Sequence, residues 1–262
     1  MTTQTVKQAK RWFVVAQLVP TLVAIAFSLL IAATQADPVG YGPAGFAAVV
    51  LAMAYVSTVF GAGKPYRWGG TAALFGLYGG IAPGLALGFV LGGMPTSALL
   101  AAPTAAIGWF AGRQLGARAR SFVAQLRPGE LADTDLELAF PARAETKPGH
   151  PRTLLVVGPR EASVTTYSRR SLSGYSSCLL EDVTAVERHS VQTAGELRFP
   201  GERGVTLALT PGSAVLLREP AGEWIFPTDQ AEEAWQLLSR RVETRRARLA
   251  ELLAEADDEA IE

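Results

Sequence analysis

The stretch from Trp68 to Gly112, WGGTAALFGLYGGIAPGLALGFVLGGMPTSALLAAPTAAIGWFAG, contains no charged side chain and decides the fold class of the chain. A helix that crosses a membrane needs about 20 apolar residues, because each residue adds about 1.5 Å and the hydrocarbon core is about 30 Å thick. This stretch is about twice that length, so it must turn back. The break is predicted at 92–95, Gly-Gly-Met-Pro, because glycine permits turn dihedrals and proline does not continue a preceding helix.

Two more apolar stretches lie nearer the N-terminus. From Trp12 to Gly112 the only charged side chains are Asp37, Lys64 and Arg67, whereas charges appear every few residues from Arg113 onward. The first part of the chain is therefore predicted to be a membrane α-helical bundle of four transmembrane helices. This domain covers residues 1–118, with spans at 12–34, 42–62, 69–92 and 96–112.

Basic residues alternate with non-basic loops along these predicted spans. Lys7, Lys10 and Arg11 precede the first span, Lys64 and Arg67 lie between the second and third, and Arg113, Arg118, Arg120 and Arg127 follow the fourth. The positive-inside rule then predicts a multi-pass protein of the cell (plasma) membrane with both termini in the cytoplasm. A cleaved signal peptide is the alternative for the first segment, since residues 34–36, Thr-Gln-Ala, resemble a cleavage site, but the apolar stretch is longer than a signal core.

Glycines recur at every fourth residue in the third span, and the same spacing returns in the fourth. The predicted helix-packing residues are Gly76, Gly80, Gly84, Gly88 and Gly92, followed by Gly108 and Gly112. Small residues at this interval leave a groove along one helix face, which lets another backbone approach closely. Two interpretations remain open: packing against the other spans of the same monomer, and homo-oligomerisation.

Polar side chains inside the predicted spans are few. None of the spans contains Asp, Glu, Lys, Arg or His in its interior, which argues against a pump or a proton-coupled carrier. The notable polar residues are Gln17, Ser28, Ser57, Thr58 and Thr104, and each is expected to bond to a helix carbonyl. A small channel or carrier built from the glycine-rich spans remains as an alternative function.

The composition excludes several kinds of chemistry. The formal net charge is zero, which gives no sign of a nucleic-acid partner. Cys178 is the only cysteine, so an intramolecular disulfide is impossible, and neither His150 nor His189 has a second ligand at metal-binding spacing. The segment 174–178 lacks the second glycine of a nucleophile elbow. No cofactor, metal or enzyme activity is predicted.

The second half of the chain is predicted to be a soluble β domain. Residues 119–152 are expected to form a juxtamembrane helix and a linker, because prolines and glycines interrupt them. About seven short strands follow, at 153–157, 162–168, 176–180, 183–191, 205–210, 214–218 and 223–226. A helix beginning at Thr228 or Asp229 closes this domain (153–244), and residues 245–262 form a charged helical extension with an acidic tail.

Two stretches of this half resemble a known family. The segment 178–187, CLLEDVTAVE, is similar to a strand pair of the bacterial pleckstrin-homology-like (PH-like) domains that are attached to membrane helices. Residues 224–226, Trp-Ile-Phe, with the helix through Leu238, are similar to the last strand and capping helix of that family. The resemblance implies a cytoplasmic PH-like β sandwich or barrel with a C-terminal capping helix. Such a fold supports an interaction domain and does not choose its ligand.

The function expected from these features is that of a non-enzymatic, membrane-anchored interaction or scaffold protein, whose cytoplasmic domain binds a protein partner beside the bilayer. An anionic-lipid sensor is the alternative. Phosphoinositide-binding members of the family carry a basic cluster between their first two strands, and this chain offers only Arg160 there. Arg169 and Arg170 open a serine-rich loop that could contact lipid or a partner.

The last helix suggests self-association as a further hypothesis. Trp235, Leu238, Val242, Leu249 and Leu252 recur at alternating intervals of three and four, with Arg245 interrupting them. This spacing makes a coiled-coil seam, and thus a homo-oligomer, possible. The alternative is that 235–242 cap the β domain and the charged continuation stays in solvent.

Overall fold

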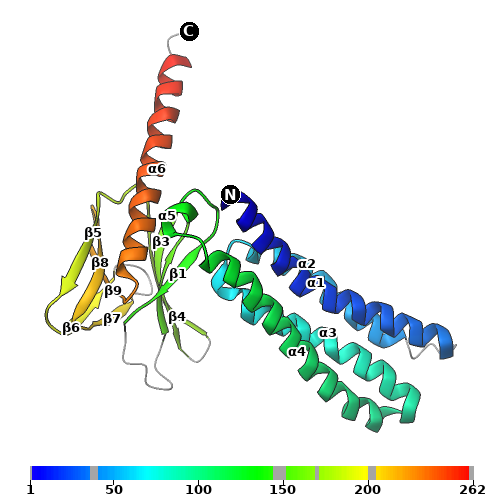
Figure 1. Ribbon diagram of the computed structural model, residues 1–262. Helices are drawn as coiled ribbons and strands as arrows, with labels where there is room; N and C mark the ends of the chain where they lie inside the picture. Colours follow the sequence, from blue (N-terminus) through cyan, green and yellow to red (C-terminus); the bar gives the residue numbers. More distant parts are fainter. Residues whose placement is uncertain (1, 36–40, 144–151, 169–170, 200–204, 260–262) are drawn as a thin grey trace. The chain divides into compact units, whose positions relative to one another are not determined.

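The computed structural model describes residues 2–35, 41–143, 152–168, 171–199 and 205–259. The chain forms two compact units, Met1–Leu126 and Arg127–Glu262 (Figure 1). The first unit is helical and the second is built mainly from β-strands.

The first unit consists of four long helices, α1 (Thr2–Gln35), α2 (Tyr41–Gly61), α3 (Pro65–Gly92) and α4 (Met94–Ala124). Three helices are long and apolar enough to cross a membrane: the Gln4–Ile31 part of α1, and all of α2 and α3. Large apolar side chains such as Val23, Val49 and Phe60 are exposed on their outer surfaces. A bundle that is apolar on its outside as well as its inside is typical of a membrane protein.

The uncharged stretch turns back at Gly93, within the 92–95 segment. Gly93 has a φ of 78°, a left-handed conformation that glycine adopts without steric cost. Pro95 then lies in the first turn of α4, where its missing N–H costs no hydrogen bond. The helix α4 continues to Ala124, so residues after 118 extend α4 and do not form the separate juxtamembrane helix that the sequence predicted.

The glycine stripe of α3 faces α4 of the same chain. A Cβ atom added to Gly76 would overlap the carbonyl oxygen of Gly108, and one added to Gly80 would overlap the carbonyl of Thr104. Gly88 lies in the same way against Ser97. The two backbones therefore approach as closely as a small-residue interface allows. The glycine stripe of α3 thus packs against another span of the same monomer, which is the first of the two interpretations.

The polar residues of the bundle differ from the prediction in two places. Thr58 donates to the carbonyl of Tyr55 at 2.6 Å and Thr104 to that of Leu100 at 2.9 Å, as expected for hydroxyls in apolar helices. The amide of Gln17 and the hydroxyl of Ser28 are buried and have no hydrogen-bond partner among the described residues. The expectation that each would bond to a helix carbonyl is wrong for these two.

The second unit contains two antiparallel sheets and a small hairpin (Figure 1). The four-stranded sheet has the order β1 (Leu138–Pro141), β2 (Arg152–Val157), β3 (Glu161–Ser168) and β4 (Ser171–Leu179). The three-stranded sheet has the order β5 (Ala185–Val191), β8 (Gly212–Glu219) and β9 (Gly222–Pro227), and β6 (Gly195–Arg198) pairs with β7 (Thr206–Leu209). The short helix α5 (Pro128–Leu131) precedes β1, and α6 (Ala231–Glu259) ends the described chain.

The core of this unit follows from the alternation of its strands. Leu155 pairs with Val164 across β2 and β3, and Leu217 pairs with Trp224 across β8 and β9, and all four side chains are buried. Helix α6 adds Ala234, Leu237, Leu238 and Val242, which are buried as well. Thr228, also buried, accepts a hydrogen bond from the backbone N–H of Gln230 just before α6 begins.

The described residues contain nine strands where the sequence predicted about seven. The additional strands are β1 and β6, each only four residues long. The prediction of a linker over 119–152 is wrong at 128–141, which forms α5 and β1. Prolines are tolerated there because Pro128 begins a helix and Pro141 ends an edge strand, positions at which no ladder hydrogen bond is lost.

Candidate functional site

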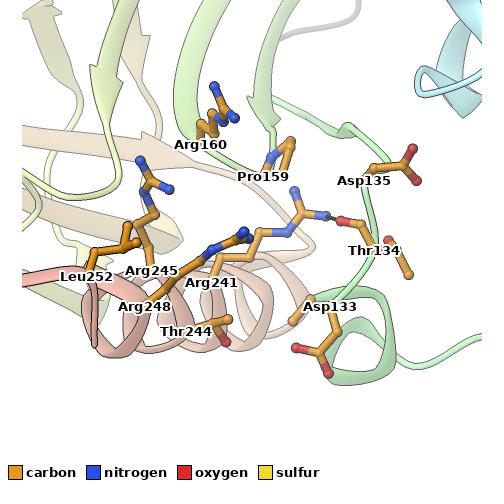
Figure 2. A pocket seen from close by; sticks show the side chains of 11 residues that line it. Asp133, Thr134, Asp135, Pro159, Arg160, Arg241, Thr244, Arg245, Arg248 and Leu252 are labelled. Atoms are coloured by element: carbon orange, nitrogen blue, oxygen red, sulfur yellow. Dashed lines mark hydrogen bonds between the residues drawn. The ribbon is translucent and has the colours of Figure 1, made fainter. Parts of the chain in front are cut away.

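A pocket of about 410 Å³ lies in the second unit, beside α6 (Figure 2). Three segments that are distant in sequence form its walls: the 132–135 segment after α5, the turn between β2 and β3, and one face of α6. The turn contributes Pro159 and Arg160. The helix contributes Arg241, Thr244, Arg245, Arg248 and Leu252. Four of these lining side chains are guanidinium groups.

Arg241 forms the floor of the pocket and holds its walls together. The side chain is only 2% exposed. Its Nη1 donates to the carbonyl of Val157 at 2.8 Å, and its Nη2 donates to the carbonyl of Leu136 at 2.7 Å and to that of Leu131 at 3.2 Å. Burial lowers the pKa of Arg241 to about 10, although nearby aspartates and a glutamate favour its charge. One guanidinium thereby satisfies carbonyls from the end of α5, the segment before β1 and the end of β2.

The other three arginines present charge to the pocket. Arg245 forms an ion pair with Glu181 at 3.0 Å. Arg160 and Arg248 make no ion pair and no side-chain hydrogen bond with any residue that the structure describes. Figure 2 shows the guanidinium groups of Arg160, Arg245 and Arg248 on one side of the pocket, while the carboxylates of Asp133 and Asp135 are directed away from them.

This arrangement can hold an anion. Guanidinium groups bind carboxylates and phosphates through paired hydrogen bonds, which are stronger than those between neutral groups. The pocket also contains the apolar side chain of Leu252 at its outer end. A ligand that combines an acidic group with a small apolar group would match these walls.

A second, shallower groove lies between the edge strand β5 and α6. Its walls are 186–190 of β5 and Trp235. Arg188 stacks over the ring of Trp235 at 5.0 Å and pairs with Glu232 at 2.9 Å. Hydrogen bonds from Gln236 and then Arg188 lower the pKa of the Glu232 carboxyl. These contacts already use the charged groups of the groove, so the arginine-lined pocket is the stronger candidate site.

The structure brings few of the predicted contact residues together. Arg160 lines the pocket. Because β1 precedes β2, Arg160 lies between the second and third strands and not between the first two. Arg169 and Arg170 lie outside the described residues.

The predicted coiled-coil residues separate into two groups. Leu238 and Val242 are buried and Trp235 is half-buried, and its Nε1 donates to the carbonyl of Val186 at 3.2 Å. These three therefore pack on their own domain, as the capping alternative predicted. Leu249 is half-buried and Leu252 is exposed.

Arg241 and Arg248 are the pocket residues that sequence reasoning missed. The sequence predicts a charged extension from residue 245 onward and a capping role for 235–242, and it predicts no pocket in either part. A signal was present in its spacing: Arg241, Arg245 and Arg248 are separated by four and then three residues, which places them on one helix face. The fact that this face meets the 132–135 segment could not be foreseen from local sequence.

The remaining chemically interesting residues lie elsewhere. Cys178 is buried in β4, and burial raises the pKa of its thiol to about 12, so it is a weak nucleophile. His189 is exposed on β5, and His150 lies outside the described residues. No group of three potential metal ligands occurs in the part of the chain that the structure describes.

Comparisons with known proteins found no match: no protein-family model, curated protein or solved structure is similar to this chain. What the arginine-lined pocket binds must therefore be inferred from its own side chains.

Proposed function

We propose that the protein is a membrane-anchored docking protein, whose soluble domain holds an acidic segment of a protein partner in the arginine-lined pocket. The observation that carries this proposal is the pair Arg160 and Arg248. Both guanidinium groups line the pocket, and neither has an ion-pair or hydrogen-bond partner among the described residues. A carboxylate placed between them gains charge-assisted hydrogen bonds without displacing an existing pair. A volume of about 410 Å³ suits a few side chains of an extended or helical segment.

We further propose that the soluble unit is a PH-like domain. Its four-stranded and three-stranded antiparallel sheets, followed by a C-terminal helix that supplies core residues, support this assignment. The β6–β7 hairpin would then be an insertion between strands of the second sheet. Such domains serve as interaction modules on many proteins, which agrees with a docking role.

The proposed anchor has four spans and places the soluble unit in the cytoplasm. Helix α4 exposes Leu99 (73%), Ile107 (69%) and Phe110 (58%), which supports contact with lipid and a fourth crossing. Arg118 stacks over Trp12 at 4.8 Å, so the basic end of α4 lies beside the basic start of α1. Basic residues gathered at one end of a bundle favour the cytoplasmic side for that end.

The test is affinity capture from native membranes with full-length protein. The bait variants are Arg160→Glu, a truncation after Arg127, and Arg240→Glu as a matched control. Arg240 is an exposed arginine of the same helix that does not line the pocket. Partner proteins are expected to be lost with the first two variants and retained with the control. Their binding should weaken as salt rises, because exposed charges are screened.

A defined probe accompanies the capture. A fluorescent hexaglutamate peptide is titrated against the full chain in detergent, and Arg160→Glu is expected to weaken binding about tenfold, in keeping with the loss of one charge-assisted pair. Equal recoveries and equal peptide binding for all full-length variants would contradict docking in this pocket. Binding of anionic vesicles that depends on Arg160, with no peptide binding, would assign the pocket to lipid instead.

A further inference from the structure

Helix α6 carries a stripe of residues that changes sign along its length. Arg241, Arg245, Arg248, Leu252 and Glu255 follow one another at intervals of four, three, four and three, so they share one face of the helix. The first three line the pocket, and Leu252 marks its outer end. Beyond Leu252 the face becomes acidic, and the sequence continues with Asp257, Asp258 and Glu259 in the last turn of α6.

The outer part of this helix is exposed among the described residues of its own unit. Leu252 is 52% exposed and Leu253 is 67% exposed, and both lie in the middle of a charged segment. The 12 residues from Arg248 to Glu259 would extend over about 18 Å. A helix of this length is marginal in water without tertiary contacts, and two exposed leucines at its centre indicate a surface that becomes covered.

We infer that the acidic segment which enters the arginine-lined pocket belongs to a second copy of this chain, and that the two α6 helices pair in antiparallel orientation about Leu252. This inference rests on the proposed docking function and names its partner. With the two-fold axis between the levels of Glu251 and Leu252, Arg248 of each copy lies opposite Glu255 of the other. Glu255 of each helix then lies at the outer end of the partner's pocket, beside Arg248.

The charge pattern selects this orientation. A two-fold interface uses the same patch on both copies, so the patch must complement itself. In the antiparallel pair the basic half of each stripe faces the acidic half of the other. In a parallel pair Arg248 would face Arg248 and Glu255 would face Glu255, and like charges at helix-neighbour distance are repulsive.

The membrane strengthens a contact that would be weak in solution. Two short helical segments bury too little surface for a stable dimer of free proteins. Anchoring both copies in one bilayer raises their effective concentration, so association can occur without a large interface. The pairing should therefore be measured with the full chain in native membranes.

Disulfide crosslinking tests the orientation. Two differently tagged full-length chains are co-expressed, one with Arg248→Cys and the other with Glu255→Cys. Native Cys178 stays in place, because it is buried and unreactive. The mixed pair is expected to crosslink several-fold more than Arg248→Cys with itself. Ala250→Cys is the matched control, since Ala250 is exposed and lies on the opposite face of α6.

Charge reversal tests the cause. With Leu252→Cys as the reporter, Arg248→Glu is expected to lower the crosslinked fraction about tenfold, because both symmetric contacts change from attraction to repulsion. The double variant Arg248→Glu with Glu255→Arg should restore it. Preferential crosslinking of Arg248→Cys with itself, or yields no higher than those of Ala250→Cys, would overturn the inference. If peptide binding through Arg160 persists in that case, the docking function stands and only the second copy is excluded as its partner.

Discussion

Replacing Arg241 by methionine tests whether one buried guanidinium holds the second unit together. Methionine keeps the length of the side chain and its packing along α6, but it donates no hydrogen bond. The buried carbonyls of Leu136 and Val157 then lose the guanidinium donor, whereas that of Leu131 keeps the hydroxyl of Thr134. Each buried carbonyl without a donor costs about 1–3 kcal/mol, and removal of a buried charge returns part of the desolvation energy. The expected net loss is about 3 kcal/mol in the free energy of unfolding.

Hydrogen exchange on the full chain in detergent measures this loss. The slowest amides of β2 and β8 report global opening of the unit, and a loss of about 3 kcal/mol lowers their protection about hundredfold. Arg245→Met is the matched control on the next turn of α6. It removes the partly exposed pair with Glu181 and is expected to cost less than about 1 kcal/mol. Equal, small effects of the two substitutions would refute the assignment of Arg241 as the group that satisfies these carbonyls.

Three further predictions concern other parts of the chain. Gly76→Ala should destabilise the helical bundle and lower the yield of folded protein in membranes, since its Cβ would overlap the backbone of α4, whereas Gly70→Ala, with open space around it, should not. Cys178 should resist a maleimide at about pH 8 in the folded protein and react fully in denaturant, because its buried thiol has a raised pKa of about 12; rapid labelling of folded protein would contradict this burial. Gly93→Val should lower the yield of folded protein more than Gly70→Val does, because a φ of 78° strains a β-branched residue; equal yields would show that this turn tolerates another conformation.

The sequence alone was sufficient where the deciding interactions are local. The length of an uncharged apolar stretch is a property of consecutive residues, so three apolar helices long enough for a membrane could be predicted, as could the antiparallel β-rich unit that follows them. The turn at Gly93 followed from glycine and proline chemistry in four residues. The predicted element boundaries were less accurate at 119–152. Pro128 begins α5 and Pro141 ends β1, and proline is compatible with the first position of a helix and the end of an edge strand.

Tertiary structure decided what no local pattern contains. The glycine spacing indicated a close helix contact, but only the fold placed that contact between α3 and α4 of one chain. The sequence predicts that the amide of Gln17 forms a hydrogen bond with a helix carbonyl. In the bundle this amide is buried and has no hydrogen-bond partner among the described residues. Arg241 falls in the segment expected to cap the β domain, and the carbonyls that it binds lie 84 to 110 residues away along the chain. The length of an apolar stretch and the residues of a turn are local properties, so both can be predicted from the sequence. The pocket depends on which distant backbone groups contact α6 in the folded protein, so it cannot be predicted in this way.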